Sequence, residues 1–337
     1  MILPWDRKLP GDIYHKHNPI AIRTGAAARA EEYGIRQHAG SEDIRWVDEA
    51  IKWLHNSGPA MDLPWVLVVN IKSPHFPHYA APEFWEMYPN ESDLPKYGIE
   101  CKSAQHPYAK AIRRHFETNR FSLEQARGLR HGYLACISFV DHQLGRLIKA
   151  LETTGMRDTT NIVYTADHGE MLGKFGMWWK CSLYEDAVRI PLIATGPDFS
   201  VGQHVKTPVD LHDLRASLFS TTAAQQPSEW LGTPLENIHR DDTRRIVFSE
   251  YHGHGVPGSC YMIRKGRWKY IHYYKAPSQL FDIETDSNEL QNLAGFDKDT
   301  VLEMETELRT ICSPSLENNR AEQFITQQLK VMVLPTF

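Results

Sequence analysis

The sequence predicts an α/β fold with a mixed, mostly parallel sheet flanked by helices, followed by a small antiparallel α+β part at the C-terminal end. Short apolar segments alternate with helical stretches over residues 41–222, which is typical of parallel or mixed sheets. From about residue 245 the segments become short, aromatic and β-prone, with tight turns between them. The chain has 337 residues, of which 42% are hydrophobic, so a real core in about two domains is expected.

The first part of the chain predicts one helix and one strand. Residues 1–40 are rich in Gly, Pro, His and Ala without a clear period, which indicates irregular structure. Ser41 is expected to cap a helix whose apolar residues follow helical spacing at Ile44, Val47, Ile51 and Leu54. The continuous apolar run "WVLVVNI" (65–71) is typical of a strand covered on both faces. Prolines in 72–85 predict a loop there.

A long helix is predicted in the middle of the chain. Ser122 and Gln125 form a capping-box pair at its start, and Gly155 ends it. One face carries apolar residues at helical spacing: Leu129, Tyr133, Ile137, Val140, Leu144, Leu147 and Leu151. Two buried strands are expected after it, in "NIVYTA" (161–166) and "RIPLIAT" (189–195), and then a helix over 209–222.

The C-terminal segments predict an antiparallel sheet. "RIVFSEY" (245–251), "CYMIRKGRWKYIHYY" (260–274) and "QLFDIE" (279–284) are its expected strands, and a helix over about 297–312 follows. We therefore expect two parts, a larger α/β domain over 1–244 and an antiparallel subdomain with a terminal helix over 245–337.

Composition excludes several function classes. The net charge of −5, with 17 His uncounted, is not that of a nucleic-acid-binding protein, which usually has a basic surplus. No window of 18 apolar residues indicates a membrane span, and the first residues lack the pattern of a secretory signal. Five widely spaced cysteines without a CxxC pattern favour reduced thiols over a disulfide framework. These features favour a cytoplasmic protein with neither nucleic-acid nor membrane partners.

The stretch "TADHGEMLGKFGMWWK" (165–180) carries the chemistry. Asp167 and His168 stand at the carboxyl end of a predicted strand, where ligands bind in open α/β sheets. A carboxylate oxygen beside an imidazole nitrogen suits a divalent cation. The alternative is that Asp167 only caps a turn and His168 lies on the surface.

A longer pattern around this stretch resembles the sulfatase family of the alkaline phosphatase superfamily. In that family a strand ends in Asp-His-Gly or Asp-Asn-Gly, and a K-x-x-x-[YF]-E-x-x-x-R-x-P pattern follows. The matching residues in "TADHGEMLGKFGMWWKCSLYEDAVRIPLI" (165–193) are Lys180, Tyr184, Glu185, Arg189 and Pro191. The resemblance implies an alkaline phosphatase-like fold.

Other stretches extend the resemblance from about residue 42 to about residue 312. "SPHFPH" (73–78) is similar to the family's P-H-x-P loop, in which His75 takes the place of the histidine near the substrate. Residues 132–151 resemble the helix before the Asp-His-Gly strand, and 279–295 resemble the family's tail signature. "SEYHGHGVPGSCYMIRKGRWKYI" (249–271) is most similar to the choline-sulfatase branch.

The resemblance implies roles for four residues in the hydrolysis of a small sulfate ester, such as choline-O-sulfate or an aryl sulfate. Asp167 and His168 would bind one divalent metal ion, calcium, with manganese or magnesium as alternatives. Lys180 would offer its charge to the sulfate oxygens. His75 would donate a hydrogen bond to the sulfate or protonate the leaving oxygen, with His78 as a competing candidate. The alternatives are a solvated Lys180 and a loop His75 stacked on prolines.

Other residues of the pattern have structural or open interpretations. Glu185 and Arg189 are expected to form a structural ion pair or hydrogen-bond clamp, and the family pattern gives Glu170 no ligand role. Four aromatic residues could line a pocket for a quaternary ammonium, pack in the core or form a subunit contact: Trp178, Trp179, Tyr273 and Tyr274.

The sequence departs from the family at the nucleophile. The family uses a Cys or Ser in C/S-x-P-x-R, matured to a formylglycine hydrate, together with an early acidic pair of metal ligands. The chain contains neither motif, although "HNPIAIRTG" (17–25) echoes the end of the first, with His17 at the place of the nucleophile. We expect a truncated form that lacks the N-terminal third of the catalytic domain.

Two further functions stay open. The first is a phosphonate monoester or phosphodiester hydrolase of the same superfamily, because a phosphoryl group fills the same tetrahedral site. The second is an inactive sulfatase-like remnant that acts as a binding or assembly subunit, which the missing nucleophile favours. Relatives often assemble through their C-terminal segments, so a homo-oligomer also stays open.

Overall fold

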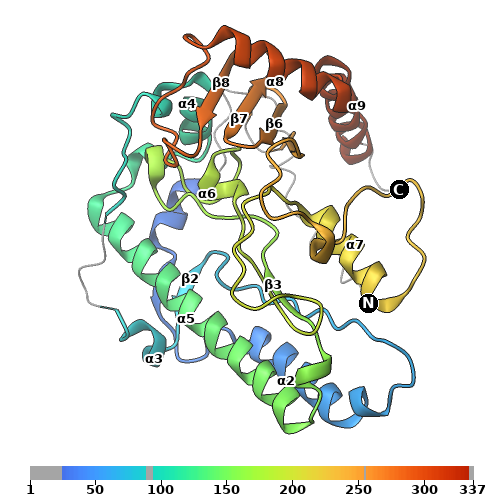
Figure 1. Cartoon of the computed structure of the whole chain (residues 1–337). Coiled ribbons are helices and arrows are strands. Elements are labelled where there is room, and N and C mark those ends of the chain that lie inside the picture. The colour runs from blue at the N-terminus through green and yellow to red at the C-terminus, as the bar shows by residue number, and fades with distance from the viewer. Residues whose placement is uncertain (1–24, 89–93, 254–255, 334–337) are drawn as a thin grey trace.

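The computed structural model describes residues 25–88, 94–253 and 256–333, with side chains up to residue 327. Residues 1–24, for which irregular structure was expected, lie outside the described residues. So does the segment "HNPIAIRTG" (17–25), except for its last residue. Helix α5 (Leu123–Thr153) runs along one side of the molecule, and the C-terminal sheet lies at the other end beneath α8 (Lys298–Ile311), with α9 (Pro314–Val333) beside it (Figure 1).

The predicted capping box of α5 is confirmed. The Ser122 hydroxyl accepts from Gln125 N at 3.1 Å, and the Gln125 side chain accepts from Ser122 N at 2.8 Å. The Gly155 φ of 71° lets the chain leave the helix in a left-handed conformation. Helix α2 (Ser41–Asn56) packs beside α5 through a cluster around Leu54 and Leu151. Its N-cap is Gly40, with φ 73°, rather than the predicted Ser41.

A short parallel pair lies against α5. Strand β1 (Tyr33–Ile35) pairs with β2 (His78–Ala80), and Gly132 of α5 faces β2. A Cβ at Gly132 would lie 2.3 Å from the His78 carbonyl oxygen, so a glycine is needed for this close approach. Short helices α3 (Pro82–Trp85) and α4 (Pro107–His115) follow in the chain.

The prediction of one mostly parallel sheet is wrong for the residues that the structure describes. Apart from β1–β2, strand β3 (Ile162–Thr165) pairs with β4 (Leu192–Thr195) in antiparallel register. The segment 65–71 pairs with no described strand. Leu67 packs near Leu54, whereas Val66 is 47% and Val68 68% exposed. An apolar run does not show whether hydrogen-bonding neighbours flank it, so the sequence of this segment predicts a buried strand that does not form.

The predicted C-terminal antiparallel sheet is confirmed. Its order is β5 (Ile246–Tyr251), β6 (Cys260–Lys265), β7 (Trp268–Tyr273) and β8 (Ala276–Asp282). Side chains alternate between its two faces. One face packs on α8 (Lys298–Ile311) through residues such as Tyr270 and Met304, and the other enters the main core with Ile271 and Phe281.

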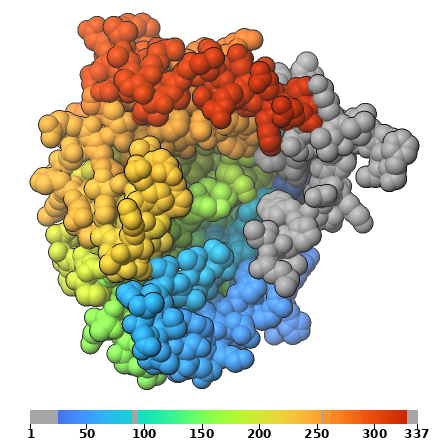
Figure 2. Space-filling view, turned by 90° about the vertical axis from the view of Figure 1, so that its right-hand side faces the viewer, coloured from blue at the N-terminus to red at the C-terminus, as the bar shows by residue number. Residues whose placement is uncertain are grey.

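Two more helices complete the described chain. Helix α7 (Leu211–Thr222) confirms the helix expected over 209–222, whereas α9 (Pro314–Val333) was not predicted. Asn318 of α9 is fully buried, and its side-chain oxygen accepts from Ser259 N at 3.0 Å. The C-terminal helices cover one end of the molecule (Figure 2). None of the described helices is long and apolar enough to cross a membrane.

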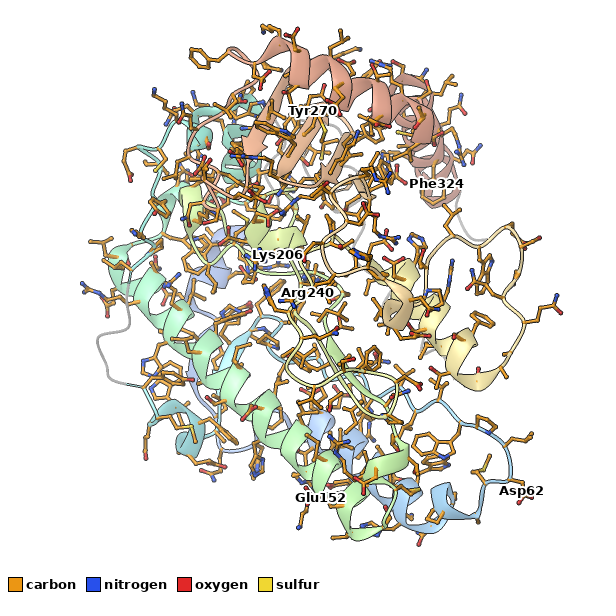
Figure 3. The ribbon with its side chains drawn as sticks, in the orientation of Figure 1. Asp62, Glu152, Lys206, Arg240, Tyr270 and Phe324 are labelled. Carbon is orange, nitrogen blue, oxygen red and sulfur yellow. The ribbon has the colours of Figure 1, made fainter. Side chains whose placement is uncertain are left out.

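Side chains mark the two ends of the molecule in Figure 3. Tyr270 lies in the C-terminal sheet, and Glu152 lies at the far end of α5. Lys206 and Arg240 lie between them in the view, where Lys206 N donates to the Arg240 carbonyl at 2.9 Å. The five cysteines form no disulfide with one another.

Candidate active site

Asp167 and His168 directly follow strand β3, as the sequence predicted. The His168 Nδ1 lies 2.9 Å from the Gly169 carbonyl oxygen, so Nδ1 carries the proton and donates. The other ring nitrogen, Nε2, lies 3.6 Å from Asp167 Oδ2. Asp167 is 84% exposed at its side chain, so this pair of atoms faces outward from the strand end.

Gly169 allows the chain to turn tightly behind this pair. Gly169 N donates to the Ala187 carbonyl, and Glu170 N donates to the Asp186 carbonyl, each at 2.8 Å. A Cβ at Gly169 would lie 2.0 Å from the Asp186 carbonyl oxygen. The glycine of the Asp-His-Gly motif is therefore required by backbone packing against helix α6 (Glu185–Val188).

The structure brings Lys180 and His75 into contact. Lys180 Nζ lies 2.8 Å from His75 Nε2, and His75 Nδ1 lies 2.6 Å from the Phe76 carbonyl. An ammonium can only donate, so Nε2 accepts and the neutral ring carries its proton on Nδ1. Burial lowers the pKa of His75, and the neighbouring Lys180 charge lowers it further. The His75 and His168 ring centroids are 6.5 Å apart, so the two motifs form one site.

The His75 loop is held by a residue that the sequence did not single out. Asp43 of α2 is 3% exposed, and its carboxylate accepts three hydrogen bonds. Lys72 N donates at 2.8 Å, Ser73 N at 3.1 Å and the Ser73 hydroxyl at 2.8 Å. Helix α2 therefore fixes where the loop begins, and the peptide bonds before Pro74 and Pro77 are cis.

Glu170 positions the backbone that carries Lys180. Its Oε1 accepts from Leu172 N at 3.2 Å and also from Trp179 N, the residue directly before Lys180. Burial raises the pKa of Glu170 to about 7, although these two N–H donors and Lys180 act in the opposite direction. Glu170 is thus a second residue of the site to which no role was assigned from sequence.

The loop around Lys180, residues 172–181, has an unusual backbone. Four of its non-glycine residues have a positive φ: Leu172 (44°), Phe175 (56°), Trp179 (64°) and Cys181 (72°). Such conformations are costly for residues with a Cβ and persist where surrounding contacts enforce them, often at functional sites. Trp179 and Cys181 flank Lys180, so its direction is set by two left-handed residues.

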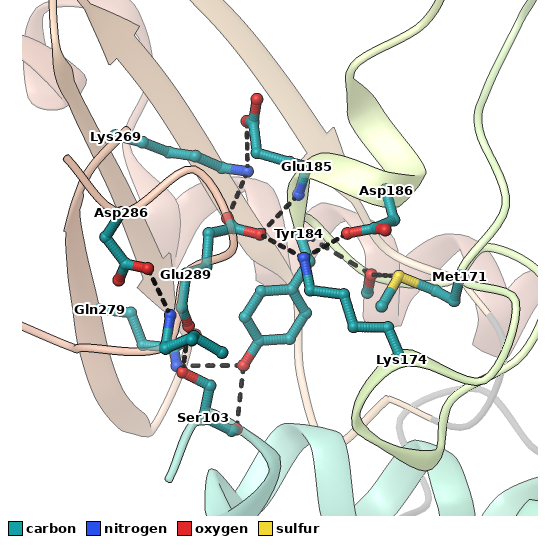
Figure 4. Close-up of polar contacts among 12 residues, drawn as sticks. Ser103, Met171, Lys174, Tyr184, Glu185, Asp186, Lys269, Gln279, Asp286 and Glu289 are labelled. Atoms are coloured by element: carbon teal, nitrogen blue, oxygen red, sulfur yellow. Dashed lines mark hydrogen bonds and ion pairs between the residues drawn. The ribbon is translucent and has the colours of Figure 1, made fainter. Parts of the chain in front are cut away.

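A buried polar network ties this loop to the C-terminal sheet (Figure 4). Glu185 N donates to Glu289 Oε2 at 2.8 Å, and Lys269 Nζ contacts both carboxylates, at 2.9 Å from Glu185 and 2.7 Å from Glu289. Lys174 bridges Asp186 and Glu289. Burial acts to raise the pKa of Glu185, but Lys269 lowers it below its ordinary value. Glu185 is therefore structural, as expected, with Lys269 rather than Arg189 as its close ion-pair partner.

Other candidate residues lie outside the site surface. His78 is fully buried, which leaves its ring unable to contact a ligand. Trp178, Trp179 and Tyr273 are 2% or 3% exposed and belong to the main core, so for these three the core interpretation is confirmed. A shallow hollow of about 670 Å³ between α2 and α5 is lined by none of the site residues.

The side-chain atoms of Asp167 and His168 have a separation that suits two ligands of one divalent ion. Two ligand atoms on one ion at 2.0–2.6 Å lie about 3–4 Å apart. The 3.6 Å between Asp167 Oδ2 and His168 Nε2 agrees with this, and the Gly169 carbonyl fixes the tautomer. Among the described residues, no group of three or more His, Cys, Asp or Glu could hold a metal ion. Asp167 and His168 are two ligand-type side chains whose separation is compatible with one shared ion.

Comparison with known proteins agrees with this geometry. The family model described as "Sulfatase" matches residues 11–224. The chain belongs to the sulfatase family. A second model, "N-sulphoglucosamine sulphohydrolase, C-terminal", matches residues 173–313 of this sulfatase-family chain. The confirmed family membership covers both halves of the site, His75 and residues 167–180.

Individual relatives show how much of a sulfatase the chain represents. It is 34% identical over 241 residues to a choline-sulfatase of Rhizobium meliloti (strain 1021), covering 68% of this chain and 46% of that protein. It is 28% identical over 337 residues to an arylsulfatase K of Xenopus laevis, covering 91% of this chain and 61% of that one. The chain therefore spans less than two thirds of either relative.

A solved structure supports the alkaline phosphatase-like sulfatase fold. The phosphonate monoester hydrolase SpPMH from Silicibacter pomeroyi superposes with a TM-score of 0.67 at 25% identity, covering 80% of this chain and 59% of that one. Motif patterns identified Lys180, His75, Asp167 and His168 in this sulfatase-family chain. Glu170 could have been suspected from its place beside the motif, whereas nothing in the sequence singles out Asp43.

Proposed function

We propose that this chain acts in the metal-dependent hydrolysis of a small sulfate ester, choline-O-sulfate or an aryl sulfate. The observation that carries the proposal is the 2.8 Å contact between Lys180 Nζ and His75 Nε2, beside the Asp167–His168 pair. Two segments far apart in the sequence thus place a cation, an imidazole and two metal-ligand types at one strand end. This combination suits a tetrahedral anion such as sulfate.

Lys180 binds the sulfate in this proposal. One ammonium hydrogen is donated to His75 Nε2, and the other two would be donated to sulfate oxygens. His75 holds Lys180 in place as long as its ring is neutral. When Lys180 turns to the sulfate, His75 Nε2 can take up a proton from solvent and would donate that proton to the leaving ester oxygen, which returns the ring to its neutral form.

Asp167 Oδ2 and His168 Nε2 would supply two of the ligand atoms of a divalent metal ion, with calcium favoured and manganese or magnesium as alternatives. When bound, such an ion supplies positive charge that polarises a sulfate oxygen. Among the described residues, no third His, Cys, Asp or Glu joins this pair as a possible ligand.

A second candidate function is the hydrolysis of a phosphonate monoester or phosphodiester. The resemblance to the SpPMH structure, at 25% identity, favours it. A phosphoryl group offers similar oxygens to Lys180, so the ratio of the rates on phenyl phosphonate and aryl sulfate esters separates the two functions.

A third candidate is a binding or assembly subunit without catalysis. It is favoured by one feature of the printed sequence, in which no Cys or Ser is followed by x-Pro-x-Arg. Anion binding without turnover is the result that distinguishes it from both hydrolases.

The test is hydrolysis of 4-nitrophenyl sulfate by the purified chain with calcium or manganese. We expect K180A to lower kcat by about 10²–10³-fold, the usual cost of removing one group that stabilises a developing oxyanion. The matched control is K149A, since Lys149 lies on α5 in an exposed ion pair with Glu152. Turnover unaffected by K180A would contradict the catalytic roles of Lys180 and His75 alike. No turnover, with sulfate binding that K180A abolishes, would favour the binding subunit.

A further inference from the structure

Arg113 is a buried arginine without an acidic partner in the part of the chain that the structure describes. It lies in the last turn of α4 and is 7% exposed. Its guanidinium makes one hydrogen bond, from Nη1 to the Phe175 carbonyl oxygen at 2.9 Å, and no ion pair with a described Asp or Glu. A buried charge without a counter-ion is costly, so this arginine weakens the fold unless an anion reaches it.

Other cations that are buried as deeply are paired within the described residues. Lys174 is 7% exposed and Lys269 is fully buried, and each contacts two carboxylates. Arg113 is the exception among them. Burial lowers the pKa of Arg113, with Tyr184 acting in the opposite direction, which agrees with a guanidinium that has no carboxylate beside it.

The N–H donors of Arg113 that Phe175 does not use are open to solvent. Nε and Nη2 donate to no acceptor of the described protein. Neither atom is among the sealed polar atoms that lack a partner in the described residues, so water reaches both. Nε–H and Nη2–H lie along one edge of the planar group, with the spacing of two carboxylate oxygens. Arg267 uses the same edge for both oxygens of Asp282.

An apolar side chain flanks this guanidinium. A Cβ at Gly176 would lie 2.8 Å from Arg113 Cδ and 2.5 Å from Ile99 Cγ2, so Arg113 and Ile99 meet over this glycine. Ile99 is 53% exposed. A ligand that reaches the open edge of Arg113 therefore finds an apolar surface beside the charge, which suits a carboxylate on a short alkyl chain.

We propose that Arg113 binds a small aliphatic carboxylate, whose two oxygens accept from Nε and Nη2 and whose alkyl chain lies against Ile99. The carboxylate supplies the counter-ion that the described protein does not, so its binding stabilises the fold. This site is independent of the proposed sulfate-ester hydrolysis, because it uses none of Asp167, His168, Lys180 and His75.

The experiment is urea unfolding of the full chain in sodium butyrate and in sodium chloride of equal concentration. Two charge-assisted hydrogen bonds give a Kd of about 1 mM. At about 100 mM, butyrate should therefore raise the folding equilibrium constant about 100-fold over chloride. Butyramide has the same shape without the charge and should have almost no effect. R113M keeps a stem over Gly176 without the donors and should abolish the butyrate effect.

Arg114 provides the matched control, because it is the next residue of α4 and is exposed. R114M should keep the butyrate effect, and so should K180A, which removes the other proposed anion-binding group. Equal effects of butyrate and butyramide, an unchanged butyrate effect in R113M, or its loss in R114M or K180A would overturn the site.

R113K decides the question if R113M does not fold. Lysine keeps the charge but lacks the paired N–H edge, so the butyrate effect should fall to about tenfold or less. A wild-type effect in R113K would overturn the two-oxygen contact with Nε and Nη2.

Discussion

At the scale of single residues, the position of Lys180 depends on the hydrogen-bond acceptors around it. Glu170 accepts the backbone N–H of Trp179, directly before Lys180, and His75 accepts from the ammonium itself. Asp43 fixes the loop that carries His75. The positions of Lys180 and His75 are therefore fixed by hydrogen-bond acceptors around them.

Replacing Glu170 tests this dependence. We expect E170A to lower the free energy of unfolding by about 1–3 kcal/mol, because two backbone donors lose their acceptor. Sulfate binding, measured by calorimetry, should weaken by about tenfold because Lys180 is no longer fixed. E170Q keeps a side-chain oxygen and should restore most of the affinity. Equal affinity in wild type and E170A would show that Glu170 does not position Lys180.

Sequence patterns identified the residues proposed to bind metal or substrate, but not the residues that hold them in position. Asp167, His168, Lys180 and His75 stand in motifs with fixed spacing, and such spacing is visible in one sequence. Asp43 meets the site only through tertiary packing, across 30 residues of sequence between Asp43 and Ser73. Contacts of that kind leave no local pattern, so only the structure reveals them.

At the scale of secondary-structure elements, the loop between β3 and α6 is held at both ends. At one end Gly169 packs against the backbone of α6, and at the other the buried network of Lys269, Glu185 and Glu289 anchors α6 to the C-terminal sheet. Helices α2, α5, α7 and α8 and the strands of the C-terminal sheet were predicted because periodicity and caps are local. The pairing of β3 with β4 was not, because it depends on which strands are neighbours.

A methyl group at Gly169 should disrupt the first anchor. In G169A the new Cβ would overlap the Asp186 carbonyl, so the two segments must separate. We expect the free energy of unfolding, measured with urea, to fall by about 1–3 kcal/mol. The control is G145A on α5, where no atom lies within 4 Å of the added Cβ. G145A should stabilise by about 0.5–1 kcal/mol, since Ala favours helix more than Gly does. A loss in G145A as large as in G169A would contradict the packing argument.

Removing the Lys269 charge should disrupt the second anchor. K269M leaves Glu185 and Glu289 buried without their shared cation, which typically costs about 3–5 kcal/mol of unfolding free energy. Lys265 on the same sheet contacts Glu303 and Glu307 at the surface, so K265M should cost at most about 1 kcal/mol. Urea unfolding of both variants gives the comparison. Similar losses of unfolding free energy in K269M and K265M would mean that burial does not determine how much these ion pairs contribute to stability.

At the scale of the whole molecule, family membership and the C-terminal sheet were predicted, whereas the large parallel sheet was not found among the described residues. The apolar segment 65–71 exposes Val66 and Val68, and Ile193 of β4 is 64% exposed. Segment 65–71 and strand β4 both have the apolar composition of buried strands. The division at residue 244 remains a proposal, since the main core joins Trp178 to Ile271 across it.

Acid stability offers a test on the complete fold. Hydrogen bonds from Arg267 lower the pKa of Asp282 from 3.8 to about 2. A lowered folded-state pKa stabilises the protein above pH 3.8, and that contribution is lost as the pH falls toward 2. With Arg267 partly exposed, we expect D282N to lower the unfolding free energy by about 1–2 kcal/mol at pH 6. Urea unfolding at about pH 6, 4 and 3 should show this difference shrinking. A difference independent of pH would exclude the ion pair as its cause.

The left-handed residues on either side of Lys180 limit how this stretch can diverge during evolution. Glycine, asparagine or aspartate can take the place of Trp179 or Cys181 with little cost to the backbone, whereas valine, isoleucine, threonine and proline cannot. In related sequences we therefore expect only a few residue types at the positions on either side of this lysine. The number of residues between the lysine and the Asp-His-Gly motif should stay the same. A search that scores this spacing and the allowed residue types would find distant homologues that a search for identical residues misses.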